Sequence, residues 1–182
     1  MGISIVSFSG RAGGNCSGIA ACLAGHWGGR AQVFDFSALS IVPCGRCGYE
    51  CFRARENCPY FGDSEYGLCE AIAGSALACF IIPNYCDYPC ANFFIFNERS
   101  QCYFQRHPEL LEKYLAVKKK FIVVSNTGQD NFTAAMRYHV AEGVEPEILF
   151  LSAREFGRVS IRGDLMEAAE AREAVLRFVE RE

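Results

Sequence analysis

The fold is decided by the stretch Ile3-Ser-Ile-Val-Ser-Phe8, Ser9-Gly-Arg-Ala-Gly-Gly-Asn-Cys-Ser17 and Gly18-Ile-Ala-Ala-Cys-Leu-Ala24. Its first part is short and apolar, which predicts a buried strand, and its last part is an apolar run that predicts a helix. The glycines between them let the backbone approach an anion, and the free N–H groups and the dipole at the start of the helix favour negative charge. The stretch therefore predicts an α/β protein that begins with a strand, a phosphate-binding loop and a helix.

Four further apolar runs predict parallel strands, at residues 31–36, 77–82, 121–125 and 147–151. Helix-compatible stretches lie between and after the strands, at residues 16–25, 66–73, 89–98, 108–117, 131–142 and 164–180. The last stretch is the clearest, because its apolar residues form one stripe and Glu and Arg occupy the other faces. This alternation predicts a doubly wound parallel sheet with helices on both faces.

The chain has 182 residues, which suits a single domain spanning residues 1–182. Its 18 Lys and Arg stand against 21 Asp and Glu, so the formal net charge is −3, and we expect no nucleic-acid partner. The N-terminal apolar run is too short to cross a membrane and lacks the charged start of a signal peptide. We therefore expect a soluble, cytoplasmic protein without a membrane partner, whose eleven cysteines do not rest as disulfides.

The predicted phosphate loop does not end in Gly-Lys-Ser/Thr, as a nucleoside-triphosphate loop does, and it lacks the Gly-x-Gly-x-x-Gly pattern of a dinucleotide loop. Ser9, Asn15 and Ser17 offer neutral donors, and Arg11 adds one positive charge. Such donors suit a monophosphate like that of flavin mononucleotide (FMN), whose ring would lie across the carboxyl ends of neighbouring strands. A glycine-rich turn without a ligand also fits this loop taken alone.

Two more polar loops follow predicted strands at the same edge of the sheet. The first is Pro83-Asn-Tyr-Cys-Asp-Tyr-Pro89, and the second is Asn126-Thr-Gly-Gln-Asp130. Aromatic rings can stack on an isoalloxazine, and amide or backbone donors can reach its polar edge. Each loop taken singly also fits an ordinary turn, so their shared position is what favours a flavin site.

Together these loops resemble those of the flavodoxin-like NAD(P)H-dependent FMN reductases, and within them the iron-sulfur flavoprotein branch. In the phosphate loop the residues that agree with the family pattern are Ser9, Arg11, Gly14 and Asn15, and those that depart from it are Phe8, Gly10 and Cys16. Cys16 stands where the family has a hydroxyl residue that binds the phosphate. We expect Ser17 to take over that bond.

The resemblance implies a flavodoxin-like sandwich with a five-stranded parallel sheet of order 2-1-3-4-5. It also implies FMN as cofactor, NAD(P)H as electron donor, a small-molecule or protein acceptor, and a homodimer or homotetramer. No side chain is expected to act as a catalytic acid or base. The cofactor-binding residues expected are Ser9, Arg11, Asn15, Cys16, Ser17, Pro83, Asn84, Tyr85, Cys86, Tyr88, Asn126, Thr127 and Gly128.

Residues 37–65 form a cysteine-rich insertion without a periodic segment, and loops of that length are usually functional or disordered. The insertion holds Cys44, Cys47, Cys51 and Cys58. If residues 47–51 form a helical turn, two of these side chains share a face and four thiolates can converge. For these four cysteines the resemblance implies an iron-sulfur cluster of the [4Fe-4S] type, while zinc and free or redox-active thiols also fit the spacing.

Other residues carry weaker signals. Residues 84–104 are strongly aromatic, which predicts either cover by a cofactor or subunit, or rings that cap one end of the sheet. Cys86 and Cys90 lie near the predicted flavin, where a helix dipole would lower a thiol pKa, although packing beside aromatic rings also explains them. We expect Cys22, Cys69 and Cys79 in the core, and His26, His107 and His139 solvated or capping.

The leading hypothesis is an FMN-dependent oxidoreductase that passes electrons from NAD(P)H through the flavin to an acceptor, with or without a cluster on the way. Two alternatives stay open from the sequence. One is an electron-transfer flavoprotein without a substrate of its own. The other is a zinc-stabilised binding module that uses the phosphate loop for a different ligand.

Overall fold

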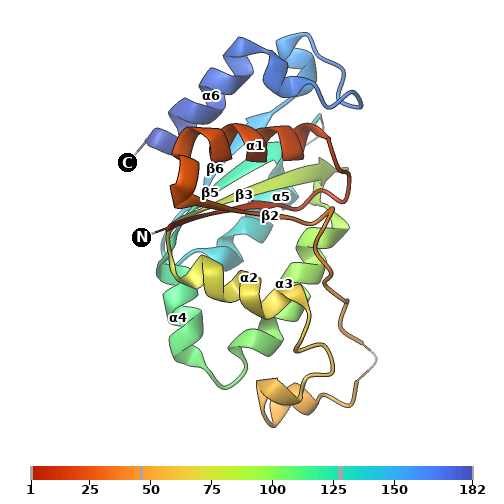
Figure 1. Cartoon of the computed structure of the whole chain (residues 1–182), viewed down its shortest axis with the longest axis vertical. Helices are drawn as coiled ribbons and strands as arrows, with labels where there is room; N and C mark the ends of the chain where they lie inside the picture. Colours follow the sequence, from red (N-terminus) through yellow and green to blue (C-terminus); the bar gives the residue numbers. More distant parts are fainter. Residues whose placement is uncertain (1, 46, 127–128, 182) are drawn as a thin grey trace.

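The computed structural model describes residues 2–45, 47–126 and 129–181, and its centre is a mostly parallel sheet (Figure 1). The parallel strands are β1 (Gly2–Ser7), β2 (Ala31–Asp35), β3 (Ser75–Tyr85), β5 (Lys118–Val124) and β6 (Glu147–Leu151). They lie in the order β2-β1-β3-β5-β6, and the two-residue β4 (Tyr88–Pro89) pairs antiparallel with the end of β3. Counted without β4, this is the predicted order 2-1-3-4-5, so the doubly wound fold is confirmed.

Helices cover both faces of the sheet (Figure 1). On one face lie α1 (Asn15–Trp27) and α6 (Ala169–Glu180), which share a core with one side of β3. On the other face lie α2 (Ser64–Ala73), α3 (Ala91–Phe104), α4 (Pro108–Ala116) and α5 (Asp130–Met136). Successive side chains of a strand point to opposite faces of the sheet. Phe80 therefore packs in the core under α2 to α5, and Ile81 packs in the core under α1 and α6.

Aromatic rings dominate the core beneath the carboxyl ends of β1 and β3. The ring of Phe8 lies 4.9 Å from that of Phe36 and 5.3 Å from those of Phe80 and Phe93, measured between centroids. Of the aromatic segment at residues 84–104, the rings that enter this core are Phe93, Phe96 and Tyr103. The capping interpretation therefore holds for these rings of α3, whereas Tyr85, Tyr88 and Phe94 are exposed.

The predicted bounds of three helices were wrong by several residues. The helix predicted at residues 89–98 spans Ala91–Phe104: Pro89 pairs with Asn84 across a tight turn before its start, and the helix continues past the predicted end. The helix predicted at residues 131–142 ends at Met136, because a tighter 3-10 turn at residues 137–139 brings a histidine into the core. The helix predicted from residue 164 begins at Ala169, after a 3-10 turn whose first N–H is bound by a side chain of the phosphate loop.

His139 also corrects the expectation of a solvated or capping histidine. Its side chain is buried, its Nδ1 lies 2.8 Å from the Tyr114 hydroxyl, and its ring stacks on Phe96. Burial, helped by the nearby Lys119, lowers the pKa of His139 to about 3. It is therefore a neutral core residue. Cys69 and Cys79 are fully buried as expected, and Cys22 is half-buried.

Among the described residues, no helix is both long and apolar enough to cross a bilayer.

Candidate functional site

A cavity of about 390 Å³ opens at the carboxyl edge of the sheet, where β1, β3 and β5 end. This is where open α/β sheets bind their ligands, and the volume lies in the usual range for small-molecule sites. The lining residues are Ser9, Arg11, Gly14, Asn15, Cys16, Pro83, Asn84, Tyr85, Cys86, Val124, Asn126, Ser160 and Ile161. The structure thus brings most of the predicted flavin residues to one place, while Thr127 and Gly128 lie outside the described residues.

The start of α1 supplies backbone donors to this cavity. The first intrahelical bond runs from the N–H of Gly18 to the carbonyl of Gly14 at 3.0 Å, so the N–H groups of residues 15–17 have no acceptor inside the helix. The first turn of α1 contains no acidic residue, and the side chain of no described residue caps it. Free N–H groups at the positive end of a helix form an anion site, which fits the phosphate of FMN.

Ser17 is placed differently from the prediction. It is absent from the described lining, and its hydroxyl donates to Asp35 Oδ2 at 3.0 Å. Asp35 is the last residue of β2, and its other oxygen accepts the N–H of Ser37 at 2.9 Å. For Ser17 to donate to a phosphate, as the resemblance implies, it would have to give up the bond to this carboxylate.

The segment after β6 completes the site, although the sequence analysis predicted no binding residue in it. Asn15 Nδ2 donates to the Ser160 carbonyl at 3.1 Å, and Asn15 Oδ1 accepts the N–H of Leu165 at 3.1 Å. Asn126 Nδ2 donates to Ser160 Oγ at 2.7 Å, so the amides of two predicted flavin residues hold this segment in place. Topology could have predicted it, because a segment that follows a parallel strand must leave from the same edge.

A two-residue turn, Cys86-Asp87, joins Tyr85, which lines the cavity, to Tyr88, which does not line it in the described structure. Both residues have left-handed backbone angles, with φ of 53° and 68°, as a tight hairpin requires. Asp87 Oδ2 accepts the backbone and side-chain N–H groups of Asn131, at 3.2 and 3.0 Å, which ties the turn to α5. Tyr85 and Tyr88 therefore stand opposite each other, and the two residues are 65% and 52% exposed.

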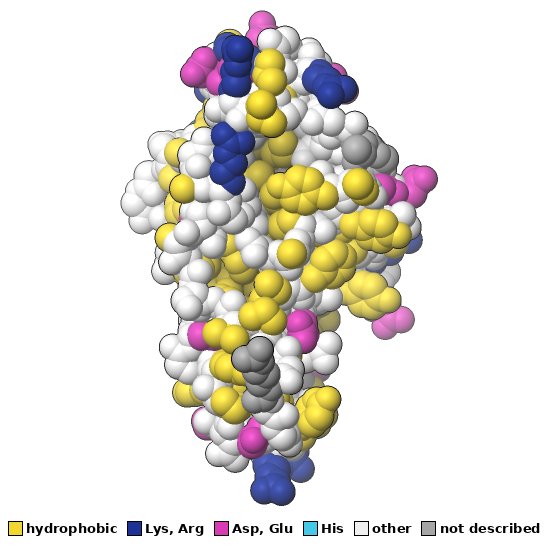
Figure 2. Space-filling model, turned by 90° about the vertical axis from the view of Figure 1, so that its right-hand side faces the viewer, with side chains coloured by type: hydrophobic (Ala, Val, Ile, Leu, Met, Phe, Trp, Pro, Cys, Tyr) yellow, Lys and Arg dark blue, Asp and Glu magenta, His cyan; other side chains and the backbone are white. Residues whose placement is uncertain are grey.

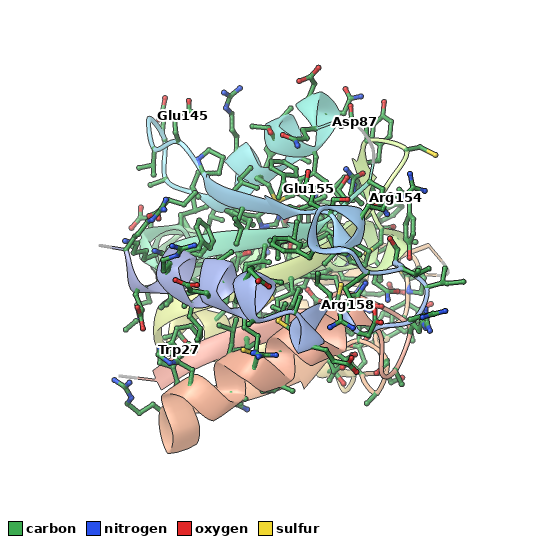
Figure 3. The ribbon with its side chains drawn as sticks, turned by 90° about the horizontal axis from the view of Figure 1, so that it is seen from above. Trp27, Asp87, Glu145, Arg154, Glu155 and Arg158 are labelled. Atoms are coloured by element: carbon green, nitrogen blue, oxygen red, sulfur yellow. The ribbon has the colours of Figure 1, made fainter. Side chains whose placement is uncertain are left out.

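The surface at this edge of the sheet carries many exposed hydrophobic side chains. Figure 2 shows hydrophobic side chains gathered across its middle, with Lys and Arg at its margins. Viewed from above, Asp87, Arg154 and Arg158 lie at this end of the sheet, and Trp27 and Glu145 lie at the opposite end (Figure 3). An apolar surface beside a polar anion site suits a ligand that has a flat aromatic ring and a charged tail.

Burial raises the thiol pKa values at this edge. The pKa of Cys16, in the first turn of α1, is raised mainly by desolvation, with further contributions from Cys90 and Asp35. The pKa of Cys90 is also raised by desolvation, which outweighs backbone hydrogen bonds from the start of α3. Of the two interpretations of Cys90, the structure therefore favours packing over activation by the helix dipole: the thiol is buried and donates to the Phe8 carbonyl at 3.3 Å.

The cysteine-rich insertion does not bring its four cysteines together as the predicted ligand set. Cys44 Sγ lies 4.0 Å from Cys102 Sγ, and Cys102 donates to Cys51 Sγ at 3.5 Å, so a cysteine of α3 takes the central place. Tyr49, with a φ of 59°, interrupts the helical turn that would have aligned Cys47 with Cys51. Within the described parts of the chain, no group of three or more His, Cys, Asp or Glu side chains is arranged to hold a metal ion.

Comparisons with known proteins agree with this fold. No protein-family model matches the chain, and no curated protein does. Among solved structures, a Trp repressor binding protein from Bacillus subtilis is 15% identical, with 99% of each chain covered and a TM-score of 0.62. FerB, a flavoenzyme NAD(P)H:(acceptor) oxidoreductase from Paracoccus denitrificans, is 14% identical, with 98% of this chain and 94% of that chain covered and a TM-score of 0.56.

A flavone reductase is 15% identical over 99% of this chain and 62% of that chain, with a TM-score of 0.54. At such low identity these likenesses concern the arrangement of strands and helices alone. The chain has the flavodoxin-like α/β fold that these solved structures share.

Proposed function

We propose that the protein is an FMN-dependent oxidoreductase that takes electrons from NAD(P)H and passes them to a small-molecule or protein acceptor. The observation that carries the proposal is the cavity at the carboxyl edge, where a helix start with free N–H groups lies in one pocket with the aromatic ring of Tyr85. Two of the solved structures with this fold are named as an NAD(P)H oxidoreductase and a flavone reductase, which supports the same class of reaction.

In this proposal the flavin supplies the hydride and electron chemistry, and the protein binds and orients it. The N–H groups at the start of α1 and the guanidinium of Arg11 hold the phosphate. The space for the ribityl chain and ring is lined by Pro83, Asn84, Tyr85, Cys86 and Asn126. The resemblance adds Thr127 and Gly128 to this set, and both lie outside the described residues. Tyr88 stands opposite Tyr85 across the turn but is absent from the described lining, so its predicted contact with the flavin stays a prediction. Asn15 acts by positioning, because its amide fixes the segment after β6.

Predictions about metal, assembly and location extend this proposal. A [4Fe-4S] cluster or zinc at Cys44, Cys47, Cys51 and Cys58 stays a prediction from the resemblance and the spacing, and no contact of the described residues supports it. No electron step is therefore assigned to a metal. A single domain, a cytoplasmic location and a homodimer or homotetramer stay predictions as well, and the exposed apolar face at the cavity supports an assembly.

Flavin titration tests the proposal directly. We expect FMN fluorescence to be quenched on binding, riboflavin to bind at least tenfold more weakly because it lacks the phosphate, and NADH or NADPH to bleach the bound flavin without oxygen. Tyr85→Ala should weaken FMN binding three- to tenfold, about 0.5–1.5 kcal/mol. Tyr138→Ala is the control, since Tyr138 is 79% exposed and does not line the cavity in the described structure.

Failure to bind FMN would refute the flavin assignment. Binding without bleaching by either nicotinamide would refute the NAD(P)H oxidoreductase and leave an electron carrier.

A further inference from the structure

We propose that Cys44, Cys102 and Cys51 form a peroxide-oxidised thiol relay that ends in a disulfide between Cys51 and Cys102. The relay goes beyond the proposed function and does not depend on a bound flavin. It rests on three sulfur atoms in contact, one of which belongs to a helix that follows the cysteine-rich insertion by many residues.

The three sulfur atoms form a continuous chain. Cys102 lies in the last turn of α3, with its Sγ 3.5 Å from Cys51 Sγ and 4.0 Å from Cys44 Sγ. A disulfide bond is about 2.05 Å long, so either pair closes through a shift of about 2 Å or less in a loop without long helices. The central sulfur can therefore bond to either neighbour, as an exchange of disulfides requires.

A buried arginine fixes the insertion where the relay needs it. Arg99 lies one turn before Cys102 on α3, and its Nη1 donates to the Val42 carbonyl at 2.6 Å. The same nitrogen pairs with Asp63 at 2.7 Å, and the two side chains are 0% and 8% exposed. The chain on both sides of the cysteines is thereby held against α3, and Arg106 adds a bond to the Arg53 carbonyl at 2.8 Å.

Exposure sets the order of oxidation. Cys44 is half-buried, whereas Cys51 and Cys102 are about 5% exposed, so a small hydroperoxide reaches Cys44 first. Reactivity of a thiol depends on its access to the oxidant, and among these three cysteines access favours Cys44.

The chemistry balances with one hydroperoxide as the oxidant. The Cys44 sulfur attacks the peroxide O–O bond and becomes a sulfenic acid, and the released alkoxide takes the former Cys44 proton to leave as an alcohol, or as water from hydrogen peroxide. The Cys102 sulfur attacks the Cys44 sulfur, and the displaced hydroxide leaves as water with the Cys102 proton. Cys51 then attacks Cys102, which restores the Cys44 thiol with the proton of Cys51. Two thiols have lost two electrons, and the peroxide has gained them.

The test maps disulfides after brief exposure of the whole purified protein to hydrogen peroxide, by alkylation in denaturant and peptide mass spectrometry. We expect a Cys51–Cys102 disulfide in the unaltered protein. Cys44→Ser should slow its formation at least tenfold, and Cys51→Ser should stop the reaction at a Cys44–Cys102 disulfide. Cys22→Ser is the matched control, because Cys22 is also half-buried but lies on α1, and it should leave the rate within twofold.

The mapping in the unaltered protein decides the question even where a variant folds poorly. Oxidation without a disulfide among these three cysteines would overturn the relay, and so would an unchanged rate in a folded Cys44→Ser variant. Iron or zinc bound in stoichiometric amount to the purified protein and lost on Cys102→Ser would overturn it too, because the sulfur atoms would then be metal ligands.

Discussion

The carboxyl-edge cavity and the cysteine-rich insertion lie on the same molecule but are held together in different ways. The cavity is built from loops that each follow a strand, so the order of the sheet alone brings them to one edge. The insertion is placed by the buried ion pair of Asp63 with Arg99 and by contacts of residues 42, 44 and 51 with α3, across 36 to 58 positions of the chain. Topology therefore organises the first region, and one buried ion pair organises the second.

The largest effect is expected from breaking that ion pair. Arg99→Met leaves the buried carboxylate of Asp63 without its cation, and such losses cost about 3–5 kcal/mol. Urea unfolding measures this loss, and alkylation of Cys51 in the folded variant should become faster because the insertion is released. Arg177→Met, which breaks an exposed pair with Glu173, is the control and should cost less than about 0.5 kcal/mol.

The Arg99→Met variant also tests whether the cavity is independent of the cysteine-rich insertion. FMN affinity of folded Arg99→Met should stay within twofold of the unaltered protein, because this arginine touches no loop of the cavity in the described structure. A large loss of FMN affinity without unfolding would show that the insertion also shapes the flavin site, and the contrast between the regions would be wrong.

The cavity has its own weak point where the segment after β6 crosses the phosphate loop. Gly163 has a φ of 78°, and a Cβ added there would lie 2.5 Å from the Gly13 carbonyl oxygen. Gly163→Ala should therefore displace the phosphate loop, destabilise the protein by about 2–3 kcal/mol and weaken FMN binding at least tenfold. Scanning calorimetry measures the loss of stability as a lower unfolding temperature, and titration calorimetry with FMN measures the rise in the dissociation constant.

Gly157→Ala is the matched control for Gly163→Ala. Gly157 also has a left-handed φ, of 66°, but an added Cβ would meet no described atom within 4 Å. This variant should show only backbone strain of about 1 kcal/mol and an FMN affinity within threefold of the unaltered protein. Equal effects of the two substitutions would mean that strain, rather than contact with the phosphate loop, governs the site.

These differences explain what the sequence could and could not predict. The strands, the phosphate loop and the turn at Cys86 follow from local patterns and from the rule that ligands bind at carboxyl edges, so most of the cavity was predictable. Cys102 was missed as a partner of the insertion because α3 has no short-range signal linking it to Cys44. Ser160 was missed because the segment after β6 has no motif, and only the path of the chain brings it to Asn15.

Stability against pH should depend on a carboxyl group in the first turn of α2, at the end of the cysteine-rich insertion. Glu65 is fully buried, and desolvation raises its pKa from 4.5 to about 8, although Cys69 and Arg99 lower it in part. Between these values the folded state holds a proton that the unfolded chain has released, so the free energy of unfolding should fall as the pH rises, by up to about 1.4 kcal/mol per pH unit. In Glu65→Gln this slope should be missing in urea titrations from pH 5 to 8.

An unchanged slope in that variant would show that Glu65 is already ionised in the folded protein. Glu70→Gln serves as its control, because Glu70 is an exposed residue of the same helix, and its slope should match that of the unaltered protein.

The smallest effect concerns the carboxylate beside the phosphate loop. Asp35 accepts the hydroxyl of Ser17, in the first turn of α1, and its negative charge opposes that of a phosphate held by the same turn. Asp35→Asn keeps an oxygen for Ser17 and removes the charge, so FMN should bind about three- to tenfold tighter, roughly 1 kcal/mol of relieved repulsion. Riboflavin, which has no phosphate, should bind equally to both proteins.

Glu173→Gln makes the same change in net charge on an exposed face of α6, and it should leave both affinities unaltered. If Asp35→Asn instead weakened FMN binding, the carboxylate would be holding Ser17 in a useful orientation, so the bond to Asp35 would support the phosphate site rather than oppose it. If riboflavin and FMN gained equally, the charge of Asp35 would act on the ring or ribityl chain. The phosphate would then lie away from the start of α1, and the assignment of the loop would have to change.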